Sequence, residues 1–191
     1  MWSIAAYMVI CMVSSLFRVE DGPTFRNIWY IYNCLMSIGS GIFSIVGFCS
    51  LVSATSDTQI TSLWVASKYL EWADTVFLTL ADKPIQVLHY WHHGTTVVLF
   101  SLAAMDDVMN NLGMLLNGWV HCVMYMHYAN PLPWRYARFI TCGQIAQFVL
   151  ILLYYITHLD RFGSNDKSTV AASLVLSYLI LFIHYFYTRR F

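Results

Sequence analysis

Three histidines stand close together in the segment "LHYWHHGTTVVLF", residues 88–100. His89, His92 and His93 are spaced i, i+3 and i+4, so in a helix their imidazoles point to the same side, one turn apart. An imidazole can act as a base, a nucleophile or a metal ligand near neutral pH, and the spacing alone does not choose among these roles. One histidine in a membrane helix is usually a hydrogen-bonded core residue, but three on one face are hard to explain by packing.

Charged side chains precede this segment in "KYLEWADTVF", residues 68–77. Lys68, Glu71, Asp74 and Thr75 are spaced i, i+3, i+6 and i+7, which places them along one helical face. Ionisable groups at membrane depth are costly unless they are paired or face a cavity, so each is a functional hypothesis. A buried ion pair that only joins helices explains Lys68 with Glu71 equally well. Asp74 has no partner nearby in the sequence.

A further stripe lies in "NGWVHCVMYMHY", residues 117–128. Its members recur at i, i+4, i+7, i+8 and i+11, and they are Asn117, His121, Met124, Tyr125 and Tyr128. We expect Met124 to pack in the core and the tyrosine hydroxyls to find partners there. The same spacing predicts that His127 points away from His121.

The segment "TCGQIAQF", residues 141–148, carries the last stripe, in which Thr141, Gln144 and Gln147 share one helical face. Two glutamines on a membrane helix can simply hydrogen-bond to a neighbouring helix. They can equally line the same polar interior as the histidines.

These side chains need a membrane bundle to position them. The chain is 59% hydrophobic and only 10% charged, with a mean hydropathy of +0.58, which is far too apolar for a soluble domain of 191 residues. Windows of about 20 residues predict seven apolar stretches. They are residues 1–17, 28–53, 60–80, 87–104, 112–130, 139–157 and 170–188. We therefore predict an all-α, polytopic membrane protein, one domain over residues 1–191 with seven transmembrane helices.

The first stretch has no basic residue before its apolar run and no small-residue cleavage site, so we expect a retained helix rather than a signal peptide. All five cysteines lie in apolar stretches and none has zinc-type spacing, so neither a disulfide framework nor a metal site is predicted. The formal net charge is zero, and nothing suggests nucleic acid as a partner.

Lys and Arg residues divide unequally between alternate loops. One side collects Arg18, Arg26, Lys83, Arg135, Arg138, Arg189 and Arg190, and the other has Arg161 and Lys167. Because basic loops stay in the cytosol, we predict a lumenal N-terminus and a cytosolic C-terminus. All four polar stripes then fall in the cytosolic half of the bilayer. This arrangement predicts a tunnel with a polar cytosolic mouth and an apolar far end, suited to a ligand with a polar head and a long apolar tail.

Four motifs in order resemble those of the ELO family of very-long-chain fatty-acid elongases. "KYLEWADT" resembles KxxExxDT, "HYWHH" the HxxHH box, "NGWVHCVMYMHY" the NxxxHxxMYxYY motif and "TCGQIAQF" the TxxQxxQ motif, and "FIHYFY" resembles the aromatic final helix. His127 stands where the family has a tyrosine, while Tyr128 keeps the second one. The resemblance implies a 3-oxoacyl-CoA synthase of the endoplasmic reticulum membrane that needs no cofactor. It would join long-chain acyl-CoA to malonyl-CoA with loss of carbon dioxide.

Several site residues follow from this resemblance as hypotheses. His92 would attack the thioester to give an acyl-imidazole, with His89 and His93 orienting it and with Asn117 and His121 as donors to the oxyanion. In a competing version, a histidine acts as a general base without a covalent step. Lys68 would neutralise the malonyl carboxylate or a CoA phosphate, and Glu71 and Asp74 would set histidine tautomers. The other supporting or substrate-binding residues would be Tyr125, Tyr128, Gln144 and Gln147. Membrane lipid, the reductase and dehydratase of the elongation cycle and a second copy of the chain are candidate partners.

Other classes of protein compete with this interpretation. A membrane di-iron desaturase or hydroxylase needs about eight nitrogen ligands, whereas this chain has seven histidines, of which we expect four to cluster. A zinc hydrolase needs only three. A seven-helix transporter or receptor could use Lys68, Glu71 and Asp74 as a gating network, although we find neither an inverted repeat nor Gly/Pro-broken helices at mid-depth.

Overall fold

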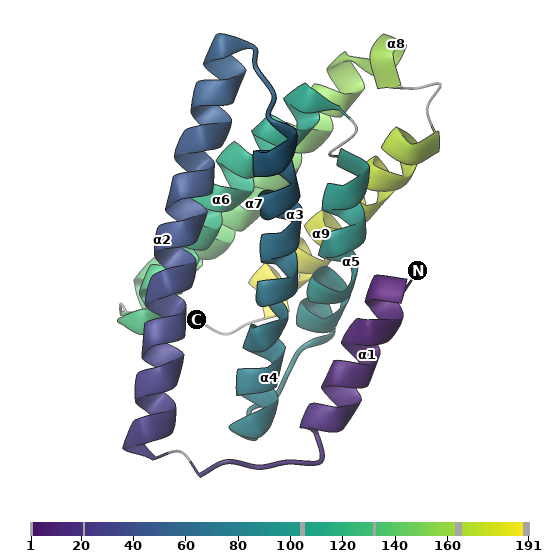
Figure 1. The fold of residues 1–191 in the computed structure, drawn as a ribbon. Helices are drawn as coiled ribbons and strands as arrows, with labels where there is room; N and C mark the ends of the chain where they lie inside the picture. Colours follow the sequence, from purple (N-terminus) through teal and green to yellow (C-terminus); the bar gives the residue numbers. More distant parts are fainter. Residues whose placement is uncertain (1, 21, 104–105, 132, 163–165, 189–191) are drawn as a thin grey trace.

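The computed structural model describes residues 2–20, 22–103, 106–131, 133–162 and 166–188, and every regular element among them is a helix. In chain order, the helices are α1 (Trp2–Ser14), α2 (Pro23–Ser53), α3 (Thr58–Leu70), α4 (Trp72–Leu80), α5 (Val87–Ala103), α6 (Asp107–Ala129), α7 (Trp134–Thr157), α8 (Leu159–Phe162) and α9 (Asp166–Thr188). The all-α prediction is confirmed (Figure 1).

Capping residues explain several of the helix boundaries. The Asp57 carboxylate accepts from two backbone N–H groups at the start of α3, at 2.7 and 3.1 Å. Asp106 caps α6 in the same way at 2.9 Å. Both side chains satisfy N–H groups that the helix itself leaves unpaired. Pro23 begins α2, where its missing N–H costs nothing.

The third predicted span is two helices rather than one, because the regular hydrogen-bond ladder is interrupted at Glu71. The backbone N–H of Asp74 donates to the Glu71 carbonyl over only three residues, at 3.1 Å. Such i→i+3 bonds tighten the turn. Glu71 keeps helical dihedral angles, with φ −63° and ψ −19°, so α4 continues in nearly the direction of α3 (Figure 1). The charged motif therefore straddles a join between two short helices.

Three described helices are long and apolar enough to cross a membrane: α2, residues 136–157 of α7, and α9. The shorter α1 is also apolar. Three of the four polar stripes lie on helices α3 to α6, and α3, α4 and α5 have only 13, 9 and 17 residues. A membrane protein is thus supported, while seven crossings and the single-domain assignment stay predictions.

Small residues bring α2 and α6 unusually close. A Cβ atom on Gly118 would lie 2.7 Å from a backbone carbonyl oxygen of α2, and one on Gly47 would lie 2.7 Å from backbone atoms of α6. The hydroxyls of Ser37 and Ser44 on α2 donate to carbonyl oxygens of α6 at 2.8 and 2.9 Å. Close backbone approach with interhelical hydroxyl bonds is how membrane helices associate without a hydrophobic driving force. This contact holds α6, and with it His121, in a defined position.

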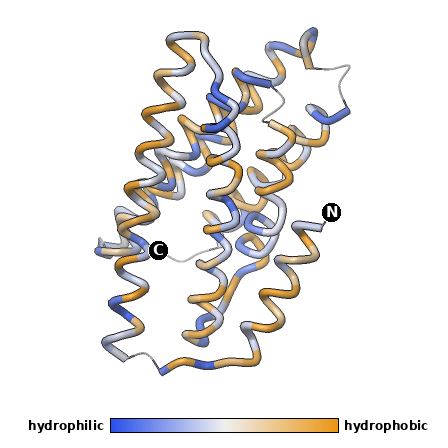
Figure 2. Tube along the Cα trace, in the orientation of Figure 1, coloured by the Kyte–Doolittle hydropathy of each residue, from blue (hydrophilic) through white to orange (hydrophobic). Residues whose placement is uncertain are grey.

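The remaining helices surround α5. Contacts join α5 to α1, α3, α4, α6 and α9, and α7 packs against both α6 and α9. Figure 2 shows hydrophobic residues along the outer helices. The outward face of α2 is an example, since more than half of each of these side chains is exposed: Ile31, Leu35, Ile38, Ile42 and Ile45. Such a surface is suited to lipid.

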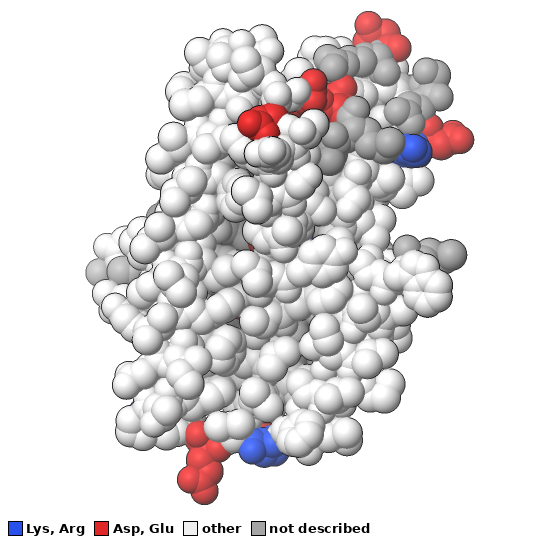
Figure 3. Space-filling model, viewed as in Figure 1, with Lys and Arg blue, Asp and Glu red and all other residues white. Residues whose placement is uncertain are grey.

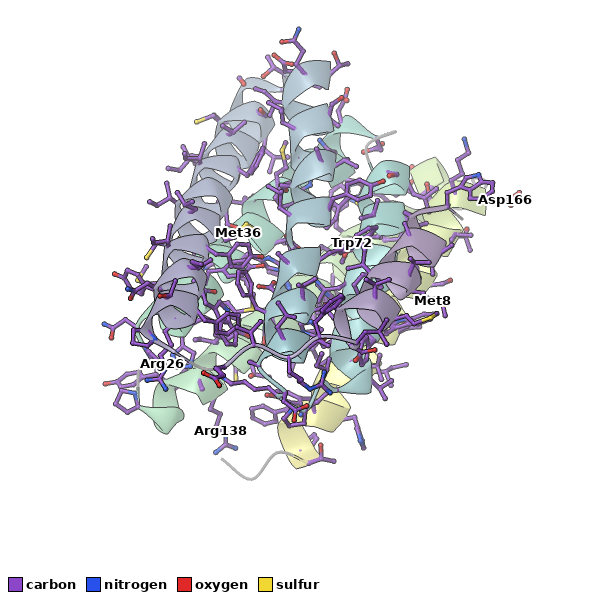
Figure 4. All side chains as sticks on the ribbon, turned by 60° about the horizontal axis from the view of Figure 1, so that its bottom comes forward. Met8, Arg26, Met36, Trp72, Arg138 and Asp166 are labelled. Atoms are coloured by element: carbon purple, nitrogen blue, oxygen red, sulfur yellow. The ribbon has the colours of Figure 1, made fainter. Side chains whose placement is uncertain are left out.

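Charged side chains gather at the two ends of the bundle and leave a broad belt between them on the face that Figure 3 shows. Basic residues at the end where α2 begins include Arg18, Arg26, Lys83 and Arg138. Acidic residues dominate the other end, with Asp57, Asp106, Asp107, Asp160 and Asp166. In Figure 4, Arg26 and Arg138 lie on the side of the molecule away from Asp166. The side chains of Arg135 and Arg161 and residues 189–190 lie outside the described part.

Candidate functional site

A cavity of about 840 Å³ enters the bundle from the basic end. Its outer lining includes Arg26, Lys83, Pro84 and Gln86, and its inner lining includes all three histidines of α5 together with His121 of α6. Side chains from α2, α4, α6, α7 and α9 complete the wall. The polar stripes therefore meet around one cavity, which we call the polar cavity.

The four imidazoles form one cluster at the inner end of the polar cavity. The ring centroids of His89 and His93 are 4.2 Å apart, and those of His92 and His93 are 5.4 Å apart. His121 lies across from α5, with its ring centroid 6.2 Å from that of His92. His92, His93 and His121 are buried, and His89 is half-buried. The spacing put three rings on one face, and tertiary packing adds the fourth.

A buried ion pair supports His121 from behind. Lys68 Nζ donates to Glu71 Oε1 at 2.6 Å and to Asn117 Oδ1 at 2.8 Å, while lying 3.5 Å from the centre of the Trp64 ring. Glu71 Oε1 is 3.2 Å from His121 Nδ1, without the alignment of a hydrogen bond. Lys68 lines neither cavity of the site. In this structure its ammonium group therefore binds a carboxylate and an amide, and its predicted role in meeting a substrate charge stays a prediction.

Asp74 finds its partner on α6. The Tyr125 hydroxyl donates to Asp74 Oδ2 at 2.6 Å, and His93 Nε2 lies 4.0 Å from the same oxygen. Tyr125 is completely buried, whereas Tyr128 is about half exposed and lines the polar cavity nearer its mouth. The two tyrosine rings meet edge to face at 6.1 Å. The Asp74 carboxylate is therefore paired across helices, which its own segment could not reveal.

The glutamines of α7 reach the same space. Gln144 Nε2 donates to Met124 Sδ at 3.4 Å, and both residues line the polar cavity together with Thr141. Gln147 is 3% exposed, and its Oε1 atom is buried without a hydrogen-bond partner among the described residues. A buried, unpaired amide oxygen is unusual and points to a ligand or water that would satisfy it.

A second, narrow cavity of about 50 Å³ continues beyond the histidines, and we call it the apolar cavity. His92 and Gln147 line both cavities. The other wall residues come from α5, α6, α7 and α9 and include Leu99, Phe148, Ile151, Ala171 and Val175. Along α5 its lining runs from His92 to Ala103, which is about 16 Å at the rise of an α-helix.

Two aromatic residues of α9 were missed as site residues. Their rings pack against His92, with centroid distances of 5.0 Å for Tyr178 and 6.1 Å for Phe182. The Tyr178 hydroxyl also lies 2.6 Å from Thr95 Oγ1. Phe182 begins the aromatic segment "FIHYFY", which was the available signal, but nothing in the sequence showed that it faces His92.

His127, which we predict to point away from His121, also lines the polar cavity near its mouth. Tyr128 and Ala129, the next residues at the end of α6, line this cavity as well. His158 instead stacks on Tyr154 at 4.3 Å, and His184 is exposed on α9. Within the described residues, no group of three or more His, Cys, Asp and Glu side chains is arranged to hold a metal ion.

The fold and site define a class of protein: a helical membrane protein with a histidine cluster between a polar and an apolar cavity. The chain belongs to the ELO family, described as GNS1/SUR4, whose model matches residues 1–190. The resemblance of the four motifs is thereby confirmed.

Curated relatives carry elongase names. The chain is 34% identical over 138 residues to human very long chain fatty acid elongase 6, a match that covers 65% of this chain and 51% of that protein. It is 30% identical to long chain fatty acid elongase 1 and 32% identical to elongase 2 of Caenorhabditis elegans, covering 74% and 75% of this chain and 55% and 59% of those proteins. The chain spans about half the length of these relatives.

Proposed function

We propose that this chain is a fatty-acid elongase that condenses a long-chain acyl-CoA with malonyl-CoA to give 3-oxoacyl-CoA, carbon dioxide and CoA. The observation that carries the proposal is that His92 lines both cavities. A thioester is the junction between a polar CoA head and an apolar acyl tail. His92 lies where such a junction would rest if the head occupied the polar cavity and the tail the apolar one.

The length of the apolar cavity suits a fatty-acyl tail. An extended peptide advances ~3.5 Å per residue, which is three backbone bonds, or about 1.2 Å per bond. An extended hydrocarbon tail advances by a similar length per bond. The roughly 16 Å between His92 and Ala103 along α5 then corresponds to about 13 bonds. The cavity is narrow as it stands, so its side-chain walls separate to admit the tail. Membrane lipid around the bundle leaves room for such movement.

The first chemical step is acyl transfer to His92. A ring nitrogen of His92 attacks the thioester carbonyl carbon, the C–S bond breaks, and an acyl-imidazole forms. His121 Nε2 takes the proton that His92 loses, because Glu71 beside Nδ1 fixes the opposite edge of the His121 ring. The proton then passes to the CoA thiolate, which leaves as CoA. In this scheme, His93 packs beside His92 and limits its rotation, and His89 packs in turn against His93.

The second step uses the same site. Malonyl-CoA loses carbon dioxide, and the resulting enolate carbon attacks the acyl carbonyl, which forms the C–C bond and breaks the C–N bond to His92. The released His92 nitrogen regains a proton from the cytosolic solvent by way of His121. Both steps place negative charge on an oxygen that needs fixed donors. Lys68 has only donors, so the Asn117 amide must turn its oxygen toward Lys68 and its NH₂ group the other way. Asn117 lines the apolar cavity beside His92, so this NH₂ group can meet the oxyanion.

Supporting roles follow for the remaining predicted residues. Asp74, held by Tyr125, limits the positions of His93, and Tyr128 borders the path of the CoA head. Gln147 offers a second amide beside His92, and Gln144 borders the same cavity. No cofactor is required by this chemistry. The alternative interpretations as a metal-dependent enzyme or as a transporter gain no support from membership of the ELO family.

The cellular setting is part of the proposal. The basic end of the bundle would face the cytosol, where the CoA substrates are, with the C-terminus on that side and the N-terminus in the lumen of the endoplasmic reticulum. The reductase and dehydratase that act on the product, and a second copy of this chain, are the partners that this chemistry suggests.

Covalent and general-base versions differ in one observable. Purified protein incubated with long-chain acyl-CoA, without malonyl-CoA, should gain the mass of the acyl group and release one CoA. Peptide mass spectrometry should locate that group on His92, and His92→Ala should abolish it while His184→Ala leaves it unchanged. Formation of elongated product with no acylated protein at any time would refute the covalent version. Absence of product from any acyl-CoA would refute the elongase assignment.

A further inference from the structure

The first helix reaches the histidine cluster through a chain of hydroxyl groups. Tyr7 of α1 is 3% exposed, and its hydroxyl lies 2.8 Å from Thr75 Oγ1. Thr75, which is completely buried on α4, places the same oxygen 2.9 Å from His89 Nε2. Three helices are thus linked by two successive hydrogen bonds that end on a ring nitrogen of the cluster.

The Tyr7 ring is held in place from two sides. Gly94 provides the space, since a Cβ atom there would lie 3.1 and 3.3 Å from two carbons of the ring. Trp72 covers the ring at a centroid distance of 5.3 Å, and its indole N–H donates to the His93 carbonyl at 2.9 Å. Figure 4 shows Trp72 on α4, close to α1. Packing on Gly94 and Trp72 therefore leaves the Tyr7 hydroxyl little freedom.

We propose that Tyr7 is a positioning residue that fixes the ring and the tautomer of His89 through Thr75. A phenol is a good donor, and the Thr75 hydroxyl has one hydrogen to give. In this proposal Tyr7 donates to Thr75 and Thr75 donates to His89 Nε2, so that neutral His89 carries its proton on Nδ1. Hydrogen bonds in such a chain strengthen one another in a buried setting. His89 in turn packs on His93 at 4.2 Å, so α1 helps to hold the cluster.

Other charged and titratable groups near His89 are few. The rings of His93 and Tyr90 face it at 4.2 and 6.5 Å, and Lys83 borders the same cavity. No described carboxylate makes an ion pair with His89. Among the described residues, the hydrogen-bond partner of the His89 ring is the Thr75 hydroxyl.

The consequence for the ring can be measured without relying on enzyme activity. Diethyl pyrocarbonate acylates unprotonated imidazole nitrogens, and peptide mass spectrometry gives the rate for each histidine. A nitrogen that accepts a hydrogen bond reacts slowly. Thr75→Val and Tyr7→Phe should each raise the rate at His89 by about fivefold, the size expected from one lost hydrogen bond. His158 serves as an internal standard because it is remote from this chain of contacts.

Matched variants separate positioning from packing. Thr75→Ser keeps the hydroxyl and should label like the natural protein. Tyr69→Phe removes the same hydroxyl group as Tyr7→Phe. The Tyr69 ring also packs on Trp72, at 4.9 Å, but the side chain is 47% exposed. This control should leave the labelling rate at His89 unchanged. Equal labelling of His89 in the natural protein and Thr75→Val would overturn the proposal. So would a Thr75→Ser variant that labels like Thr75→Val, since the effect would then come from packing.

The catalytic part of this inference rests on the proposed elongase function. Thr75→Val should lower kcat by about fivefold with KM for malonyl-CoA unchanged, and Thr75→Ser should restore kcat. A changed KM for malonyl-CoA with an unchanged kcat would contradict a positioning role. The natural protein could form no product while the variants still differ in the labelling of His89. In that case the elongase assignment fails and the positioning of His89 stands. If Tyr7→Phe does not fold, the two Thr75 variants decide the matter.

Discussion

His92 of α5 and His121 of α6 face each other with ring centroids 6.2 Å apart, although 28 residues separate them in the chain. His121 is backed by Glu71, and Glu71 is backed by Lys68. His92 packs against two aromatic rings, Tyr178 and Phe182, whereas His121 has one, Tyr125, in addition to the carboxylate. The two imidazoles therefore occupy different environments, one beside a carboxylate and one against aromatic rings. In the proposed mechanism, this asymmetry makes His92 the nucleophile and His121 the residue that transfers protons.

Removing one member of the buried Lys68–Glu71 ion pair should destabilise the protein more than removing both charges. Lys68→Met leaves the Glu71 carboxylate buried without its ammonium partner and should lower the free energy of unfolding by about 3–5 kcal/mol. The double variant Lys68→Met with Glu71→Gln removes both charges and should recover more than half of that loss. Thermal unfolding in detergent, followed by tryptophan fluorescence, measures both. Additive losses in the double variant would mean that the two side chains are not coupled.

Loss of the Asn117 amide should affect turnover rather than substrate binding. Asn117→Leu removes the donor proposed for the oxyanion, and kcat should fall by about 10²–10³-fold with little change in KM. Asn110→Leu is the matched control, because Asn110 is a buried asparagine on the same helix that donates to Thr61 and lines neither cavity. This control should lose stability but keep kcat. Similar kcat values for the two variants would remove Asn117 from the mechanism.

Filling the apolar cavity should shorten the product. Ala171 lines that cavity on α9, and it lies seven residues before Tyr178, which contacts His92. That separation is about 10 Å along the helix. Ala171→Phe should move the longest product down by at least one elongation cycle, as measured by gas chromatography of the fatty acids formed. Leu176→Phe adds bulk on the same helix at a side chain that is 48% exposed, and it should leave the product range unchanged.

Removing a positive charge at the mouth of the polar cavity should raise KM. Lys83 lines the polar cavity and lies 4.5 Å from the centre of the Trp29 ring. Lys83→Ala removes an exposed charge from the path proposed for the CoA phosphates, and KM for malonyl-CoA should rise by up to about fivefold, as for a pair worth at most ~1 kcal/mol. The same change at Lys167, at the opposite end of the bundle, should have no effect. A larger KM effect at Lys167 would reverse the assignment of the CoA entrance.

Close packing of α2 against α6 predicts a contrast between two glycines. Gly118→Ala places a methyl group 2.7 Å from a backbone oxygen, so the helices must separate, at a cost of about 1–3 kcal/mol. Gly39→Ala on α2 meets nothing within 4 Å and should be neutral or stabilising, since alanine favours the helix by ~1 kcal/mol. Unfolding midpoints of the two variants provide the test. Equal midpoints would mean that α2 and α6 are not in close contact.

The sequence by itself determined the helical class and which residue types share a face. A membrane leaves a chain of this composition few ways to satisfy its backbone other than helices. Helical periodicity then placed His89, His92 and His93 on one side, because that spacing depends only on local geometry. The order of the four motifs also indicated the family.

Only the tertiary structure decided which faces meet. The partner of Asp74 is Tyr125, 51 residues away, and Tyr7, which no motif contains, hydrogen-bonds to the same Thr75 hydroxyl that contacts His89. His127 borders the polar cavity at the end of α6, although it lies on another face of the helix than His121. Periodicity describes one helix at a time, whereas these contacts depend on how closely helices approach, and small residues such as Gly47, Gly94 and Gly118 set that approach.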